Sequence, residues 1–444
     1  MHTPTSSVAA APGTRLFDGV TSYHWLVVVI ASCGWLFDCM DQRLFILARE
    51  SALKDLLRAD PAALASLKSY AGYATTSMIL GWATGGMIFG MMSDRLGRVK
   101  TMVVTLLVYS MFTGLCGLAT SWVDFTLYRF LAGIGIGGMF GAATTLVAES
   151  VPANFRAVAL GALQALSATG NIMGSLITLQ IPPGATGLFG GYPGWRVLFF
   201  VGLLPALLVV PTMLVLREPQ SWLDAKARAR TAGGAKHVGS VSELFRHPRW
   251  RKNATVGLFL GLAGMVGLWG IGFFSPELIS VALVGAPQTV VDTVRGWGTA
   301  LQDVGSFVGM LVFTVVAARL SRRFAFLCAF LLSMLTTMYV FYSLRTASDA
   351  YWMLPMMGFA QLAVFAGYSI YFPELFPTRL RGTGVGFCYN TVRYLAAPAP
   401  ILLGYLATLM SFRTAAVMMS TIYLVGIVAL WWAPETKGQP LPED

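Results

Sequence analysis

The chain has 444 residues, of which 56% are hydrophobic and only 11% are charged. A soluble domain carries roughly 25% charged residues, so this composition excludes an ordinary soluble protein and indicates one that lies in a membrane. The net charge of +11 could suggest a nucleic-acid-binding protein. However, the basic residues lie between apolar runs rather than in one patch, and we expect no nucleic-acid partner.

Apolar runs of about 20 residues recur along nearly the whole chain, and each is long enough to cross the lipid bilayer as a helix. They predict an all-α integral membrane fold with twelve transmembrane helices. Polar tails, residues 1–22 and 434–444, flank the apolar runs. The predicted spans are residues 23–47, 70–91, 100–120, 123–147, 157–180, 195–216, 254–281, 296–318, 324–344, 350–372, 382–408 and 412–433.

The longest polar segment, residues 217–252, contains nine Lys or Arg residues and three Asp or Glu residues. Because basic residues mark the cytoplasmic loops of membrane proteins, we expect this linker in the cytoplasm. It separates a predicted N-terminal six-helix bundle, residues 23–216, from a C-terminal bundle, residues 253–433. The charges of the other loops follow the same rule, which predicts cytoplasmic tails at both ends. We expect the protein in a plasma membrane, namely the inner membrane of a bacterium.

Two motifs recur with nearly the same displacement along the chain. The pattern E-x-x-P-x-x-x-R occurs at residues 149–156 and again at residues 374–381. The pattern R-L-x-R occurs at residues 95–98 and again at residues 319–322. Two independent matches at one displacement predict two pseudo-symmetric halves of six helices each. Parallel halves around a site in the middle of the membrane are a transporter design.

Charged residues inside the apolar runs are candidates for proton coupling. Asp38, Asp41 and Arg43 lie in the first run, where a charge costs several kcal/mol and usually marks an ion or substrate path. Asp38 and Asp41 can act as one acidic site, and Arg129 of the fourth span lies at a similar depth. We predict that these two acids and Arg129 couple transport to protons; a permanent buried pair is the alternative. Asp303 is a second titrating candidate or a structural partner, whereas Arg43 is expected to snorkel or to pair with loop acids.

Arg393 lies near the middle of the eleventh span, with no acid within four residues. Arginine binds carboxylates through two parallel hydrogen bonds, so we predict that Arg393 holds an anionic substrate. The alternative is a pair with Asp303. Further polar and aromatic residues could complete the site, although hydrogen bonds between helices explain each of them equally well. These candidates are Asn390, Gln164, Asn171, Gln361, Tyr368, Tyr371 and Tyr394.

Four motifs resemble those of the major facilitator superfamily, and together they extend over essentially the whole chain. They are GMMSDRLGRVK at residues 90–100, RFLAGIGIGG at residues 129–138, DCMD at residues 38–41 and PETKG at residues 434–438. The resemblance implies a secondary transporter that works by alternating access. The D-x-x-D spacing is similar to that of aromatic-acid and organic-acid proton symporters, although Cys39 stands where those usually have glycine. REPQSWL, at residues 217–223, and PETKG resemble elements of sugar porters, in which an acid of the first helix pairs with an arginine of the fourth. In organic-anion carriers, an arginine on the eleventh helix contacts the substrate.

The loop motif implies a gate, because acids and arginines at helix ends can switch between two sets of charge-assisted bonds. Its second copy has Ala318 in place of Asp94 and Ser321 in place of Gly97, so we expect only the N-terminal copy to retain its acid. The predicted gating residues are Gly90, Asp94, Arg95, Gly97, Arg98, Glu149, Arg156, Glu374 and Arg381.

The sequence contains no catalytic triad, ATP-binding motif or metal-ligand spacing. We therefore expect no enzyme activity, no metal and no cofactor besides the coupling proton. The leading prediction is proton symport of a small organic carboxylate, such as an aromatic acid, by a functional monomer. The alternatives are a proton-coupled or facilitative sugar or polyol porter and, in a different class, a sensor that binds solute without moving it.

Overall fold

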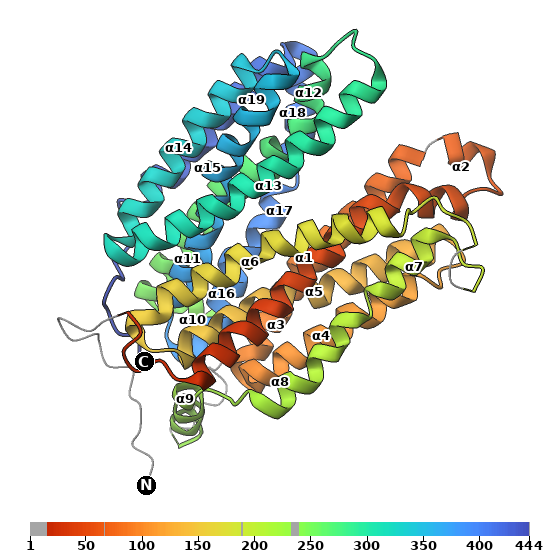
Figure 1. Ribbon diagram of the computed structural model, residues 1–444. Coiled ribbons are helices and arrows are strands. Elements are labelled where there is room, and N and C mark those ends of the chain that lie inside the picture. Colours follow the sequence, from red (N-terminus) through yellow and green to blue (C-terminus); the bar gives the residue numbers. More distant parts are fainter. Residues whose placement is uncertain (1–15, 66, 188–189, 232–238, 444) are drawn as a thin grey trace.

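The computed structural model describes residues 16–65, 67–187, 190–231 and 239–443. Over these residues, the helices form two bundles of six membrane-crossing segments each, which confirms the predicted fold class (Figure 1). The N-terminal bundle contains α1 (Ser22–Leu56), α3 (Leu67–Leu96), α4 (Arg98–Cys116), α5 (Trp122–Ser150), α6 (Ala153–Gln180) and a last segment made of α7 (Gly194–Val201), η1 (Leu204–Leu208) and α8 (Val209–Val215).

The C-terminal bundle has the same number of crossing segments, but several of them are interrupted. Its first segment runs through α11 (Pro248–Met265), η3 (Val266–Ile271), η4 (Gly272–Phe274) and α12 (Ser275–Ala282). The next three are α13 (Gln288–Arg319), α14 (Arg322–Ser343) and α15 (Ala347–Glu374). The fifth contains η5 (Thr378–Leu380), α16 (Arg381–Gly386), η6 (Phe387–Thr391), α17 (Val392–Ala396) and α18 (Ala399–Leu409), and the sixth α19 (Phe412–Met419), η7 (Ser420–Ile422) and α20 (Tyr423–Ala429).

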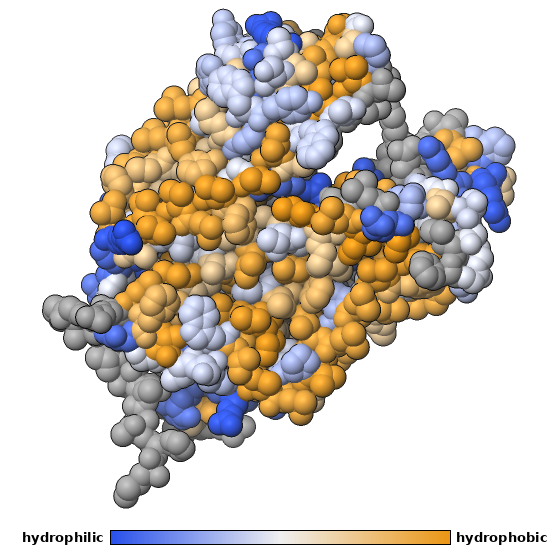
Figure 2. All heavy atoms as spheres, in the orientation of Figure 1, coloured by the Kyte–Doolittle hydropathy of each residue, from blue (hydrophilic) through white to orange (hydrophobic). Residues whose placement is uncertain are grey.

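Among the described residues, three short helices lie outside the crossing segments. They are α2 (Pro61–Ala65) in the loop after α1, and α9 (Gln220–Thr231) and α10 (Val241–Arg246) in the linker. The bundles meet at the end that carries α9 and α10 and diverge toward the end that carries α2 and α12 (Figure 1). We call these the linker end and the open end. Apolar side chains cover the flanks of the molecule, and the surface is hollowed between the two bundles at the open end (Figure 2).

Within the described residues, nine helical segments are long and apolar enough to cross a membrane. Three predicted spans, now α3, α6 and the segment α16–α18, fall outside this set although they lie within the bundles. Each of them contacts the other half, because α3 packs against α16 and η6, while α6 packs against α13. Helices at such a contact can be less apolar because protein, rather than lipid, covers part of their surface.

Glycines allow α3 and α16 to touch across the two halves. A Cβ atom on Gly90 would lie 2.7 Å from the carbonyl oxygen of Gly382, and one on Gly386 would lie 2.5 Å from the carbonyl oxygen of Gly86. Both distances are too short for a side chain. Gly90, which the sequence assigned to the gate, therefore lies at a direct backbone contact between the bundles.

Two of the C-terminal segments contain π-helical turns, η3 and η6, that the sequence did not predict. Hydropathy alone cannot reveal them, since a π turn changes the hydrogen-bonding register without changing the apolar character of the run. Such turns occur often at functional sites. Here η6 brings Tyr389 and Asn390 to the contact with α3.

The close packing of α5 on α3 can be tested with two glycines of α5. A Cβ atom on Gly137 would overlap the backbone of Trp82 and lie 2.5 Å from the nitrogen of Gly86, whereas Gly141, one turn later, has no such neighbour within 4 Å. Overpacking a buried contact costs about 1–3 kcal/mol. We therefore expect Gly137→Ala to lower the melting temperature of the purified protein and Gly141→Ala to leave it nearly unchanged. Equal melting temperatures for the two variants would contradict this packing.

Candidate functional site

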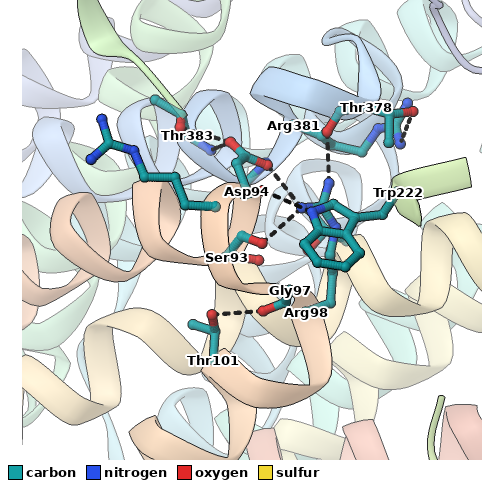
Figure 3. Close-up of polar contacts among 12 residues, drawn as sticks. Ser93, Asp94, Gly97, Arg98, Thr101, Trp222, Thr378, Arg381 and Thr383 are labelled. Atoms are coloured by element: carbon teal, nitrogen blue, oxygen red, sulfur yellow. Dashed lines mark hydrogen bonds and ion pairs between the residues drawn. The ribbon is translucent and has the colours of Figure 1, made fainter. Parts of the chain in front are cut away.

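Asp94 joins the two halves at the linker end (Figure 3). It lies near the end of α3, and its side chain is fully buried. Oδ1 accepts a hydrogen bond from the backbone nitrogen of Gly382 at 2.9 Å. Oδ2 accepts two from Thr383, at 2.8 Å from the backbone nitrogen and 2.7 Å from Oγ1. Because these residues lie in the first turn of α16, an acid of one half satisfies the free N–H groups of a helix in the other.

Arg98 and Glu149 extend this connection. The Arg98 guanidinium donates to both carboxylate oxygens of Glu149 at 2.9 Å and lies 3.1 Å from Asp94 Oδ1. Its Nη2 also donates to the carbonyl oxygen of Thr378, in the other half, at 2.7 Å. Arg381 contacts Glu149 from the C-terminal side. Glu149 is thus shared by one arginine from each half, and all four charged side chains are closed to solvent.

The C-terminal half repeats part of this network within itself. Arg322 donates to the carboxylate of Glu374 at 3.0 and 3.2 Å. Its Nη1 donates to the carbonyl oxygen of Ala317, as Nη1 of Arg98 does to that of Ser93. These contacts place the two copies of the R-L-x-R motif in equivalent environments.

The second repeated motif is also equivalent in the two halves. Nε of Arg156 donates to the carbonyl oxygen of Ala148 at 2.9 Å, and Nε of Arg381 donates to that of Pro373 at 3.0 Å. Ala318 occupies the position that corresponds to Asp94 and has no carboxylate with which to cap a helix. The two copies of the loop motif therefore differ in structure at the position where Ala318 replaces Asp94.

Gly97 and Arg95 complete the loop motif. Gly97 connects α3 and α4 with φ at 119°, a conformation that favours glycine. Arg95 is exposed, and its carbonyl oxygen accepts a hydrogen bond from Lys226 of α9 at 3.1 Å. Trp222, also on α9, donates to the carbonyl oxygen of Asp94 at 2.7 Å. The linker helix α9 is thus bonded to the end of α3.

Two acids from motifs that resemble sugar porters cap helices. Glu218 accepts hydrogen bonds from backbone N–H groups in the first turn of α4 at 2.7 and 3.2 Å. Glu435 accepts equivalent bonds in the first turn of α14 at 3.0 and 3.2 Å. Burial opposes ionisation of Glu435, but hydrogen bonds from Lys437, Arg322 and their neighbours outweigh it and hold its pKa below the usual value. These motifs therefore have a structural explanation that involves no substrate.

Arg129 pairs with Asp41 inside the N-terminal bundle. Nη1 of Arg129 lies 3.3 Å from Asp41 Oδ2, and both side chains are fully buried. The guanidinium also donates to Thr113 Oγ1 at 2.9 Å and to Cys116 Sγ at 3.0 Å. Of the two acids that the sequence offered for this arginine, the structure selects Asp41.

Asp38 is different, although it lies only one turn from Asp41. Both of its carboxyl oxygens are buried, and no Lys or Arg side chain of the described residues forms an ion pair with them. The neighbouring polar group is the hydroxyl of Tyr109, which is also buried. A buried carboxylate without a cation beside it is unfavourable in its charged form.

Asp303 pairs with Arg43 and not with Arg393. Nη2 of Arg43 lies 2.8 Å from Asp303 Oδ2, and about a quarter of each side chain is exposed. This ion pair joins α1 of one half to α13 of the other. It corrects both the expectation that Arg43 pairs with loop acids and the alternative that Asp303 neutralises Arg393.

Arg393 is buried where α17 faces α3. Its guanidinium carbon lies 3.8 Å from the ring centre of Trp82 and 5.0 Å from that of Tyr389. Its hydrogen bonds are weak, to Asn390 Oδ1 at 3.4 Å and to Met265 sulfur at 3.8 Å. No carboxylate of a described residue lies within 4.0 Å of it. Arg98, Arg129, Arg322 and Arg381, by contrast, each contact an acid.

Most of the other predicted substrate residues do not meet at Arg393. Tyr368 donates to the carbonyl oxygen of Leu260, Tyr371 to that of Pro434, and Gln361 to Thr337, all within the C-terminal half. The polar group of each of these three residues is thus used between neighbouring helices or, for Tyr371, by the C-terminal tail, which agrees with the alternative explanation by hydrogen bonds between helices.

The remaining candidates lie elsewhere. Gln164 accepts a hydrogen bond from Ser369 at 3.1 Å, which joins α6 to α15. Tyr394 is exposed, and its hydroxyl group lies 2.5 Å from that of Thr84 on α3. Asn171 is partly exposed on α6. Only Asn390 shares a direct contact with Arg393.

Sequence reasoning missed the aromatic residues around Arg393. The ring centre of Trp35 lies 6.4 Å from that of Trp82 and 6.5 Å from that of Tyr389. Phe140 stacks on Tyr389 with ring centres 3.8 Å apart. Aromatic residues are common in apolar runs, so hydropathy gave no signal. Their positions in the sequence did offer a signal, since Trp35 precedes Asp38 by one helical turn and Tyr389 directly precedes Asn390.

Residues 31–398 match the Major Facilitator Superfamily. The chain is 28% identical over 374 residues to the cis,cis-muconate transport protein of Acinetobacter baylyi, with 83% of this chain and 86% of that protein covered. It is 24% identical over 446 residues to the niacin transporter NiaP of the same species, with 95% and 96% covered. The structure of the proton:xylose symporter XylE, bound to 6-bromo-6-deoxy-D-glucose, matches it with a TM-score of 0.76 at 17% identity, with 95% and 98% covered.

The likeness to XylE concerns the fold, whereas the family match extends over most of the chain. The relatives are named as transporters, and the two bundles, the repeated motifs and the apolar flanks agree with that role. The chain is thus a multi-pass membrane transporter rather than an enzyme, and it belongs to the Major Facilitator Superfamily.

Proposed function

We propose that this protein is a proton symporter for a small organic carboxylate and that it works by alternating access. The observation that carries the proposal is Arg393, a buried cation at the contact between the halves with no described acid beside it. A buried charge without a partner is costly, and a bidentate carboxylate is the ligand that fits a guanidinium best. The substrate would supply the missing charge.

The names of the relatives support a carboxylate. Muconate and niacin, which those proteins are named as transporting, both carry a carboxylate group. The likeness to a sugar symporter is one of fold, and the acids of the sugar-porter-like motifs cap helices. A sugar or polyol porter remains the second candidate because the pair of Asp41 and Arg129 resembles the arrangement in that branch.

Asp38 is the group that we assign to the proton. Trp35, one turn before Asp38 on α1, lies against Trp82, whose ring contacts the Arg393 guanidinium. Closing the site would leave two unpaired charges away from water. An anion neutralises Arg393 and a proton neutralises Asp38, so closure is favourable when both are bound. Because of this charge balance, the carboxylate and the proton cross the membrane together and in the same direction. The pair of Asp41 and Arg129 would hold α1 and α5 in register beside the site.

The network around Asp94 is proposed as the gate. It closes the linker end while the open end is hollowed, as expected for one of the two end states of alternating access (Figures 2 and 3). The bonds of Asp94, Arg98 and Arg381 across the halves must break when the linker end opens. We propose that the linker end faces the cytoplasm of a bacterial cell, in keeping with its basic residues.

The gate can be tested with Asp94→Asn. An amide offers one oxygen where the carboxylate accepts three hydrogen bonds, so buried N–H donors of α16 lose their partner. We expect a larger population in which the linker end is open. Spin labels on cysteines at Lys100 and Arg323, both exposed and in different halves, would report it as longer distances in a variant without native cysteines.

The matched control for the gate is Asp224→Asn, which alters an exposed acid of α9 bonded to Gln220. It should leave the distance distribution as in the parent protein. The same distribution in Asp94→Asn and the parent would contradict the proposed role of Asp94.

The substrate class can be tested by the rise in melting temperature that ligands cause in the purified protein. We expect benzoate, nicotinate or cis,cis-muconate to stabilise it, and xylose or choline to have no effect. Arg393→Ala should remove the effect, because a hydrogen bond to a charged group contributes about 1.5–3 kcal/mol. Arg393→Lys should keep part of it, since lysine retains the charge without the planar fork.

Arg58→Ala serves as the control for loss of a positive charge, because Arg58 is largely exposed near α2. It should bind carboxylates as the parent does. Stabilisation by sugars alone, unaffected by Arg393→Ala, would overturn the carboxylate proposal and favour the sugar or polyol porter.

A further inference from the structure

Three polar groups around Arg393 have no assigned role. They are Nε1 of Trp35, Nε1 of Trp82 and Nδ2 of Asn390, and each is buried without a hydrogen-bond partner among the described residues. The side chains themselves are nearly inaccessible, with 2%, 4% and 0% of their surface exposed. Buried donors are almost always bonded, so three in one place require an explanation.

The contacts of these residues place them around one site. Trp82 lies against the Arg393 guanidinium, and Trp35 lies against Trp82 and near Tyr389. Asn390 reaches Arg393 with its other side-chain atom, Oδ1. Trp35 and Trp82 belong to the N-terminal half, whereas Asn390 and Arg393 belong to the C-terminal half. The unbonded groups therefore lie on both sides of the contact between the halves.

These groups are all hydrogen-bond donors. An indole N–H can only donate, a guanidinium can only donate, and the free atom of Asn390 is its amide nitrogen. A carboxylate is acceptor-only, with about four lone-pair positions, and matches such a set. A sugar hydroxyl would also have to donate, and here the oxygen of Asn390 and the sulfur of Met265 are already taken by Arg393.

We infer that the indole N–H groups of Trp35 and Trp82 bind the substrate carboxylate together with Arg393 and Asn390. This inference rests on the proposed function and adds the contribution of the N-terminal half. One ligand group would then be held by both halves, and the energy of binding would draw them together around it. Trp82 has a second effect, because its ring centre lies 3.8 Å from the guanidinium carbon and this cation–π contact holds Arg393 in place.

The test compares Trp35→Phe and Trp82→Phe, which remove the N–H group and keep an aromatic ring. The measurement is the dissociation constant of the purified protein for whichever of benzoate, nicotinate and cis,cis-muconate stabilises it most. Each variant should bind roughly 10- to 100-fold more weakly, as expected for a lost hydrogen bond to a charged group. The melting temperature of each variant without ligand reports whether the fold is retained.

Trp195→Phe is the matched control, because Trp195 is a buried tryptophan of the same bundle whose N–H donates to Asp55 at 3.3 Å. It should bind with unchanged affinity. A second readout is independent of folding: in protein labelled with ¹⁵N-tryptophan, the carboxylate should shift the indole N–H signals that are missing from Trp35→Phe and Trp82→Phe.

The outcomes separate the two proposals. Unchanged affinity in both phenylalanine variants, with binding lost in Arg393→Ala, would overturn the inference and leave the carboxylate proposal intact. Equal weakening in Trp195→Phe, with no shift of the two indole signals, would also overturn it by showing a general effect. Absence of carboxylate binding to the parent protein would overturn both.

Discussion

Inside a bundle of helices surrounded by lipid, each buried charge needs a partner of opposite sign, because an unpaired one costs several kcal/mol. The charged residues of this transporter follow that constraint almost throughout. Arg98 and Arg381 share Glu149, Arg129 contacts Asp41, and Arg322 contacts Glu374. Arg156 forms no described ion pair, but Glu374 and Glu149 act on it electrostatically. At Arg393 and Asp38 no described residue of opposite charge forms an ion pair, and there the protein offers a place for an anion and a place for a proton.

The same constraint explains why the two ends of the molecule differ. At the linker end the charges of both halves satisfy one another, which makes a closed end stable without any ligand. Nearer the open end, the described connection between halves includes one partly exposed pair, Arg43 and Asp303. Exposed pairs contribute little, about 0–1 kcal/mol. The buried ion pairs that connect the halves are therefore concentrated at the linker end.

The sequence was informative where a pattern has a direct physical meaning. Apolar runs predicted the crossing segments, and the repeated motifs predicted that Glu149 and Glu374 occupy equivalent places. The loss of the acid at Ala318 correctly predicted that the two copies of the loop motif differ. Arg393 stood out because a charge with no nearby acid is rare in a span.

Pairing in three dimensions was not predictable in the same way. The sequence offers both Asp38 and Asp41 as partners for Arg129, because they lie one turn apart on the same helix. Only the rotation of α1 in the bundle decides which of them contacts the arginine. The partner of Asp303 lies on a distant segment, and the π turn η6, which carries Asn390, leaves no trace in hydropathy. The indole groups of Trp35 and Trp82 were missed because an aromatic residue in an apolar run looks like core until its N–H group is examined.

The central claim, that proton and carboxylate move together, is tested most directly by uptake into liposomes with an imposed pH gradient. The parent protein should accumulate the bound carboxylate against its gradient, and a protonophore should abolish accumulation. Asp38→Asn, which keeps a neutral side chain in place, should still exchange carboxylate across the membrane but no longer accumulate it. Undiminished accumulation by Asp38→Asn would contradict the role of Asp38, and binding without any flux in the parent protein would show a sensor instead of a transporter.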